Sequence, residues 1–571
     1  MDVKGRKALV FGGAGLVGRA VCKELIESGI SSLVVCSRFK EEAEEFASEL
    51  RSRYNADVDV EWGDIFLRYN MRELPRDEIM RDARLRRIFL SDIVEPLNRD
   101  ILTESAVFQI LMKHKPDIII DSINTASIIA YQNVFGEMRK VLSKIGGDPG
   151  ELAFSAEKLV GTLYIPQLIR HVQIMLQSMM EANTRFYLKI GTCGTGGMGL
   201  NIPYTHSEDR PSQMLLAKSA IAGAHSLLLF LMARTPGGPI IKELKPAAAI
   251  AWKKVAYGTI KRQGSPILLE DVSLEDAVSL SGYISKAFRG EIRYLMKEGV
   301  PMALEAPYID TGENGFFSLG EFEAITDEGQ MEFITPEEIA KCVTWEIQGL
   351  NTGHDIVAAL DNSVLGPTYR AGYMRHGAIR ELKRLVEATG VDSVAFEILG
   401  PPRLSKLLYE AYLLKKEYGT FDAVLAMRPE EISRHLETVI LSDPLLRSRI
   451  ISIGIPILLS SGLKLLRGSR MAVPPDVPGQ PDAKFEVDDT RIDKWANDGW
   501  VDLRPKNILK WQTRFRYIKA YVDGIPKDDT SSSLVKGVHY WKDDEGKWPI
   551  SISKLASWIF INEDRGERMK W

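Results

Sequence analysis

Three evenly spaced glycines near the start of the sequence constrain this chain more than any other feature. Gly12, Gly15 and Gly18 follow a short apolar run, residues 8–11, and precede a segment with the apolar spacing of a helix. A strand, a glycine turn and a helix in this order bring backbone N–H groups close to a pyrophosphate at the positive end of the helix. A second apolar run, residues 33–36, follows at the distance expected for a β-α-β unit. The pattern therefore predicts a dinucleotide site, with contacts expected from Gly12, Gly13, Ala14, Gly15, Leu16, Val17 and Gly18.

The residues after the next two predicted strands bear on which dinucleotide binds. Ser37 and Arg38 stand where folds that prefer NAD carry a carboxylate for the ribose 2′-hydroxyl, and an arginine there suits a 2′-phosphate. The sequence therefore favours NADP, with NAD as the alternative. The plainer interpretation is that Arg38 merely begins the next helix. Asp64 and Ile65 follow a third predicted strand, where a carboxylate can meet the adenine amine.

Strands and helices continue to alternate along the first half of the chain. The triple isoleucine at residues 118–120 is typical of a buried parallel strand, and Asn124, Thr125 and Ala126 follow it on the side expected to face the cofactor. Further runs predict a helix at 166–182 and strands at 186–191 and 245–252. This order predicts an α/β fold with a Rossmann-type, doubly wound parallel sheet. The charged stretch 66–100 is predicted to be an insertion that carries a helix.

These pieces together resemble the extended short-chain dehydrogenase/reductase superfamily, to which nucleotide-sugar epimerases and dehydratases belong. The resemblance covers roughly residues 5–365. Its later matches are Thr192, the segment 203–211, Lys218 and a helix start at Thr335, with Glu338 three residues on.

The resemblance implies a catalytic Ser or Thr, a Tyr and a Lys. A phenol has a pKa near 10, so it needs a neighbouring cation to transfer protons near neutral pH. In a helix, residues four apart lie on one face, so a Tyr-x-x-x-Lys pattern joins the two groups. Thr192 and Lys218 fill two of the three positions, but Met214 occupies the place of the tyrosine and cannot transfer a proton.

Three interpretations of this departure stay open. In the first, an acid from the loop before the helix replaces the tyrosine, with Tyr204, His206, Glu208 and Asp209 as candidates. In the second, the chain is similar to nucleotide-sugar 4,6-dehydratases that carry Met in the triad, although those have Thr-Asp-Lys where this chain has Thr192-Cys-Gly. In the third, the protein is a non-catalytic NADP-binding regulator or scaffold.

We predict the first, an NADP-dependent hydride transfer at a carbonyl or carbinol carbon of a bulky small molecule, with a nucleotide-linked substrate among the candidates. The catalytic residues would be Lys218, Thr192, Tyr204 and His206. The plainer interpretations of Tyr204 and His206 are a packed turn aromatic and an ordinary loop histidine.

The domain organisation is predicted from changes in pattern along the chain. Residues 1–365 form the cofactor-binding domain, in which 300–335 make a loop over the site. Residues 366–470 form a helical domain, and 471–571 a Pro-rich linker and a tail with seven of the ten tryptophans. Such a tail is expected to wrap another part of the molecule or a neighbouring subunit, with stacking on a sugar or nucleotide as the sharper alternative.

Composition excludes several classes of function. A net charge of −4 does not suggest a nucleic-acid partner. The four cysteines lack metal-ligand spacing, so we expect no metal site and a reduced, cytoplasmic protein without a secretory signal. The apolar run 450–463 is too short to span a bilayer and predicts a buried or interface helix, although peripheral contact with lipid stays open. We also expect a homo-oligomer.

Overall fold

The described residues of the computed structural model fall into two compact units. Unit 1 contains those of the segments Met1–Gly197, Pro211–Ala251 and Glu332–Met374, and unit 2 those of Trp252–Met331 and Arg375–Trp571. The structure describes residues 1–130, 132–191, 213–246, 249–288, 290–312, 315–327, 334–350, 355–357, 362–365, 368–398, 401–477, 480, 482–531 and 535–564. The sequence-based boundaries at residues 365 and 470 stay predictions.

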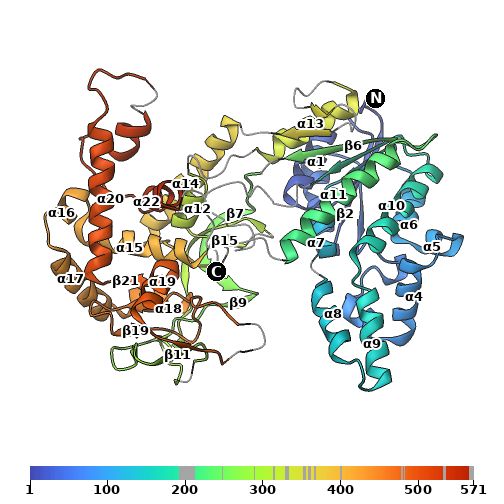
Figure 1. Cartoon of the computed structure of the whole chain (residues 1–571). Coiled ribbons are helices and arrows are strands. Elements are labelled where there is room, and N and C mark those ends of the chain that lie inside the picture. The colour runs from blue at the N-terminus through green and yellow to red at the C-terminus, as the bar shows by residue number, and fades with distance from the viewer. Residues whose placement is uncertain are drawn as a thin grey trace. The chain divides into compact units, whose positions relative to one another are not determined.

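The centre of unit 1 is an eight-stranded sheet with the order β16-β17-β6-β5-β4-β1-β2-β3 (Figure 1). Neighbouring strands are parallel except at the edge, where β16 runs antiparallel to β17. The strands are β1 (Lys7–Phe11), β2 (Ser32–Ser37), β3 (Val58–Trp62), β4 (Ile118–Asp121), β5 (Phe186–Ile190), β6 (Ile240–Pro246), β16 (Asp355–Val357) and β17 (Asn362–Leu365). Strand order reverses between β1 and β4, which is where ligands bind in such sheets. The predicted Rossmann-type, doubly wound sheet is confirmed.

Helices cover both faces of this sheet because successive side chains of a strand point to opposite faces. From β1, Ala8 and Val10 join a core with α1, α2 and α13, whereas Leu9 and Phe11 join a core with α6, α10 and α11. The first layer is α1 (Leu16–Glu27), α2 (Lys40–Tyr54) and α13 (Pro336–Gln348), and the second is α6 (Ala106–His114), α10 (Tyr164–Glu181) and α11 (Gln213–Ala233).

Two predictions for unit 1 need correction. The stretch 66–100 holds α3 (Arg76–Arg81), α4 (Ala83–Val94) and the start of α5 (Arg99–Glu104) in place of one helix, because its scattered apolar side chains form a small core of their own. The strand placed at 245–252 is β6, which lies earlier. It ends at Pro246, and proline lacks the N–H that a sheet ladder needs.

One stretch of α11, Leu216–Ala233, is long and apolar enough to cross a membrane by length and composition. Core helices of water-soluble folds pass the same test, so the signal is weak. Leu229 and Met232 of this stretch pack against the sheet.

Unit 2 combines helices with small sheets. Its helices α15 (Pro402–Tyr418) and α17 (Pro429–Ser442) confirm the helical pattern predicted for this region. The segment 300–335, predicted to be a loop, contains β14 (Glu305–Asp310), which pairs with β7 (Lys254–Thr259), and α12 (Leu319–Ile325). The apolar run 450–463 is buried as far as Leu459, whereas Leu463 is 65% exposed, and the run is not one helix. There α18 (Pro444–Ser452) ends, and β18 (Ile457–Leu458) follows Pro456, a residue that breaks helices.

The tryptophan-rich tail belongs to the core of unit 2. It forms α19 (Asp489–Gly499), α20 (Pro505–Asp523) and α22 (Ile552–Asn562), and five of its tryptophans are at most 5% exposed: Trp495, Trp500, Trp511, Trp541 and Trp548. Phe421 stacks on Phe515 at 4.1 Å between ring centroids and on Trp548 at 5.9 Å. The tail therefore packs against other parts of the chain, and these buried rings are not available for stacking on a ligand. Trp571 lies outside the described residues.

The predicted start of the late helix, α13, is confirmed and yields a stability prediction. The Thr335 hydroxyl donates to Glu338 at 2.8 Å, and the backbone N–H of Glu338 donates back to it at 3.3 Å. Thr335→Ala should lower the free energy of unfolding by about 1 kcal/mol, because the backbone N–H of Glu338 loses its acceptor and the Glu338 carboxylate loses one of its donors. Thr335→Ser keeps the oxygen and should cost less than half as much. Urea unfolding of the full chain measures both, and an equal effect of the two variants would contradict the capping role.

Candidate cofactor site and active site

The glycine turn between β1 and α1 has no room for side chains. Gly12 has a φ of +74°, and a Cβ placed there would lie 2.8 Å from the Ser122 hydroxyl. A Cβ on Gly18 would overlap the carbonyl oxygen of Gly12. Helix α1 starts after Gly15 with no side-chain cap, so its first-turn N–H groups need partners from outside the helix. A bare, uncapped helix start beside a glycine turn fits a pyrophosphate.

A basic cluster lies where the second and third strands end. The structure brings together Arg38 and Asp64, two of the predicted cofactor contacts, with 3.6 Å between Arg38 Nη1 and Asp64 Oδ2. Arg76 Nε lies 3.5 Å from the same oxygen. Arg38 also donates to the backbone carbonyl of Arg72 at 3.1 Å, whereas the Arg72 guanidinium donates to backbone carbonyls elsewhere, those of Trp62 and Tyr69. Two guanidinium groups beside one carboxylate leave an excess of positive charge. That excess suits a phosphate on the ribose.

The other two residues predicted near the ribose and adenine lie in less open positions. The Ser37 hydroxyl donates to Glu42 at 3.2 Å. Ile65 is 5% exposed and belongs to one of the apolar layers of the sheet.

A cavity of about 170 Å³ lies at the switch point of the sheet. It is lined by the first turn of α1, by the segments that leave β4, β5 and β6, and by α11, with Val17, Ser122, Ile123, Asn124, Thr125, Lys189, Ile190, Gly191, Ala222, His225, Glu243 and Pro246. The predicted contacts Val17, Asn124 and Thr125 are therefore brought together. The side chain of Ala126 lies outside the described residues.

A buried ion pair fixes one wall of this cavity. Lys189 Nζ lies 2.9 Å from Asp121 Oδ1, and the Tyr187 hydroxyl donates to the other carboxylate oxygen at 2.9 Å. Burial alone would raise the pKa of Asp121, but the Lys189 ammonium outweighs it and lowers this pKa. Lys189 also donates to the Ile123 carbonyl at 2.5 Å and lies 3.3 Å from the Thr125 hydroxyl. The ion pair thus holds the segment that leaves β4 against β5.

A second buried carboxylate, Glu243 of β6, lines the cavity. It accepts a hydrogen bond from the Ser226 hydroxyl at 3.1 Å, and Lys245 Nζ lies 3.6 Å away. Burial raises the pKa of Glu243 and outweighs the opposing effect of Lys245. A carboxyl group that holds its proton more tightly than usual can act as a proton donor.

Two histidines next to these groups are uncharged near neutral pH. Burial lowers the pKa of His225 to about 3 and that of His171 to about 4. Their ring centroids are 6.4 Å apart, and His171 Nε2 has no hydrogen-bond partner among the described residues. With pKa values this low, both imidazoles are weak bases near neutral pH, and they can take part in hydrogen bonds in their neutral form.

The predicted catalytic residues are only in part within the described structure. Lys218 is 5% exposed on α11, and Ala222 and His225, four and seven residues further on, share its helix face and line the cavity. Thr192, Tyr204 and His206 lie outside the described residues, as does the side chain of Met214. Their predicted roles stay predictions.

Sequence reasoning missed the three ionisable groups that line the cavity, namely Lys189, His225 and Glu243. A signal was present for two of them. Lys189 and Glu243 interrupt apolar strands, and a charge in a buried strand needs a partner or a function. Among the described residues there is no cluster of His, Cys, Asp or Glu that could hold a metal ion.

The sequence profile of the beta-methylindole-3-pyruvate reductase C-terminal domain matches residues 273–564, which is just over half of the chain. The chain belongs to this family. A profile described as the KR domain matches residues 7–94, which contain the glycine turn and the first three strands. This match supports a similarity of the N-terminal part to the short-chain dehydrogenases/reductases. With the cofactor site, the two matches support an oxidoreductase that uses a nicotinamide cofactor.

Solved structures are similar only at low identity. A short-chain dehydrogenase/reductase from Serratia marcescens is 14% identical over 64% of this chain and 98% of that one, with a TM-score of 0.29. A short-chain dehydrogenase from Sphingobium yanoikuyae in complex with NADPH is 15% identical over 43% and 71%, with a TM-score of 0.24. Pen from Bacillus thuringiensis is 12% identical over 43% of this chain and 50% of its own length, also at 0.24. These similarities are too low to bear on activity. A search of curated protein sequences found no match.

The glycine turn yields a binding prediction. Gly18→Ala should weaken the binding of NADPH by at least about tenfold, because the added methyl group overlaps the turn that receives the pyrophosphate. Energy transfer from tryptophan to the nicotinamide measures the affinity. Gly223→Ala is the matched control, since a Cβ there meets nothing within 4 Å. Unchanged binding in Gly18→Ala would contradict the assignment.

The buried histidines yield a prediction for pH dependence. Both pKa values are depressed in the folded state, so the unfolded chain takes up protons first and stability falls as the pH drops below the usual histidine value of 6.5. The loss levels off near pH 3–4, and at pH 5 it amounts to about 2 kcal/mol for each histidine.

His225→Gln should therefore remove about half of the loss in unfolding free energy that these two groups cause between pH 7 and pH 5. His376→Gln, at an exposed position, serves as the control. Urea unfolding at both pH values supplies the numbers, and an unchanged slope in His225→Gln would show that His225 is not buried in its neutral form.

Proposed function

We propose that this protein is an NADPH-dependent reductase that converts the keto group of a 2-oxo acid with a bulky aromatic side chain to a hydroxyl group. The observation that carries the proposal is the cavity at the switch point, which joins the glycine turn to buried acid–base groups. The substrate class is supported by the family to which the chain belongs, which is described as the beta-methylindole-3-pyruvate reductase C-terminal domain. The extended, epimerase-like subtype and a nucleotide-linked substrate remain less favoured proposals.

The choice of NADPH over NADH is supported by the basic cluster at the ends of β2 and β3. Arg38 and Arg76 both lie beside Asp64 and carry more positive charge than this carboxylate can neutralise. A phosphate on the ribose 2′-oxygen adds the missing negative charge.

The chemistry needs a hydride for the keto carbon and a proton for its oxygen. Bound NADPH supplies the hydride. We assign the proton to Glu243, whose raised pKa keeps it protonated more often than an ordinary carboxyl group. The carbonyl oxygen accepts this proton as the carbon accepts the hydride, and the product is a 2-hydroxy acid. Glu243 is then reprotonated from solvent, and Ser226 and Lys245 hold it in place. Lys218 and Thr192 would hold the oxygens of substrate and ribose, and Tyr204 and His206 are the alternative donors.

One observation favours a second candidate function. Met214 occupies the place of the usual tyrosine, which is compatible with a protein that binds NADP without reducing a substrate. A nucleotide-sugar dehydratase is the third candidate. Only the reductase consumes NADPH, because a dehydratase returns the hydride to its own substrate and a non-catalytic protein transfers none. Conversion of a nucleotide sugar without net change in the cofactor separates the dehydratase from the non-catalytic protein.

The proposal is tested by following NADPH oxidation with indole-3-pyruvate for the wild type and for Glu243→Gln. The amide keeps the shape of the side chain but cannot donate the proton, so we expect kcat to fall about 100-fold while the NADPH affinity changes less than about threefold. Glu305→Gln, on the exposed side of β14, is the matched control and should keep full activity.

Full activity in Glu243→Gln would refute its role as donor and move that role to Tyr204 or His206. Tight NADPH binding without turnover of any aryl 2-oxo acid would instead support the non-catalytic candidate.

A further inference from the structure

Helix α20 presents a row of positive charge at regular helical spacing. Lys506, Lys510 and Arg514 are four residues apart, so they follow one another along one face of the helix. No side chain caps the start of this helix, where the helix dipole adds further positive potential. The row is in unit 2, and nothing in the proposed reaction uses it.

This face borders a cavity of about 90 Å³ between α15, α19 and α20. Five cationic side chains line it: Lys406, Arg504, Lys506, Lys510 and Arg514. Only two carboxylates, Asp493 and Asp502, accompany them. The space is several times what one water molecule needs, so a small oxyanion fits.

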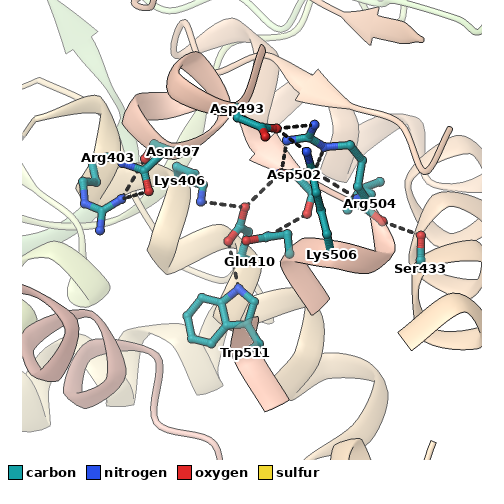
Figure 2. A network of polar contacts seen from close by, with 12 residues as sticks. Arg403, Lys406, Glu410, Ser433, Asp493, Asn497, Asp502, Arg504, Lys506 and Trp511 are labelled. Atoms are coloured by element: carbon teal, nitrogen blue, oxygen red, sulfur yellow. Dashed lines mark hydrogen bonds and ion pairs between the residues drawn. The ribbon is translucent and has the colours of Figure 1, made fainter. Parts of the chain in front are cut away.

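The two carboxylates of the lining are already engaged (Figure 2). Arg504 binds both oxygens of Asp502, at 2.9 and 2.7 Å, and donates to Asp493 at 2.7 Å. Lys506 also donates to Asp493. These contacts fix the rim of the cavity and leave neither carboxylate free to neutralise the remaining cations.

Lys406, unlike the exposed Lys506 and Lys510, is buried, and its ion pair is with Glu410. It is 3% exposed, and its ammonium lies 3.2 Å from Glu410 Oε1. Glu410 in turn accepts from the backbone N–H of Asp502 at 2.8 Å and from Trp511 Nε1 at 2.9 Å (Figure 2). Because Glu410 is shared among three donors, Lys406 is only partly neutralised. Burial correspondingly lowers the pKa of Lys406.

Two donors of this cluster have no partner within the described part of the chain. Arg514 is 7% exposed, and its Nε and Nη2 bind Glu563 at 2.6 and 2.7 Å, but Nη1 is buried without an acceptor. Lys510 is exposed at the mouth, and no hydrogen bond or ion pair joins it to a described residue. A buried guanidinium N–H without an acceptor is costly, which points to an acceptor supplied by a ligand.

From these contacts we propose that unit 2 carries a binding site for the oxyanion of a small molecule, a phosphate or carboxylate group, held by Lys406, Lys510 and Arg514. The site is independent of the proposed reductase activity. Its ligand would bring the negative charge that the two paired carboxylates of the lining do not provide.

Isothermal titration of the full chain with inorganic phosphate and, separately, with acetate tests this proposal at constant ionic strength. We expect saturable binding of at least one of them. Lys510→Gln should weaken it about fivefold, since an exposed charge is lost, and Lys510→Glu should abolish it. Arg516→Gln is the matched control, because Arg516 is an exposed cation of the same helix outside the cavity lining.

Binding of phosphate alone supports a phosphate-bearing ligand, and binding of acetate alone supports a carboxylate-bearing one. Binding of both anions supports a site for the oxyanion itself, whichever group carries it. The absence of saturable binding for both anions overturns the proposal. An equal loss in Arg516→Gln and Lys510→Gln also overturns it, because general surface charge would then explain the binding. Lys510 is exposed, so its variants test the site without disturbing the core of unit 2.

Discussion

The close approach of α1 to the strand that precedes it is the constraint on which unit 1 depends. Gly18 lies so near the Gly12 carbonyl that no side chain fits between them. This contact places the uncapped start of α1 directly beside the switch point of the sheet, where the segments from β4, β5 and β6 also end. Cofactor binding and the position of the cavity therefore follow from the same packing requirement.

Buried charge is the second organising feature, and the two units use it differently. In unit 1, Asp121 and Lys189 neutralise each other almost completely and stabilise the wall of the cavity. In Glu243, burial raises the pKa and the nearby Lys245 does not offset it. In unit 2, the lining of the cationic cavity contains more cations than carboxylates, an imbalance that fits a ligand better than catalysis. A buried charge that lacks a full partner is costly, so such groups are expected where function requires them.

The sheet and its glycine turn could be predicted from the sequence because both rest on local patterns. Apolar runs such as residues 118–120, and the spacing of Gly12, Gly15 and Gly18, carry the information within a few residues. The Thr335 cap is equally local.

Other features depend on contacts between distant segments. Glu243 and His225 meet at the cavity only after β6 and α11 have packed, and the apolar run near residue 450 becomes partly strand because β18 pairs with β19 (Lys464–Leu466) and β21 (Val501–Asp502). No periodicity in the sequence reports such pairings.

Transfer of deuterium from C4-labelled NADPH to indole-3-pyruvate would show whether hydride passes from the nicotinamide to a keto carbon. We expect deuterium at the carbinol carbon of the product, from one face of the cofactor only. NADPH that binds but transfers no deuterium to any aryl 2-oxo acid would contradict this expectation.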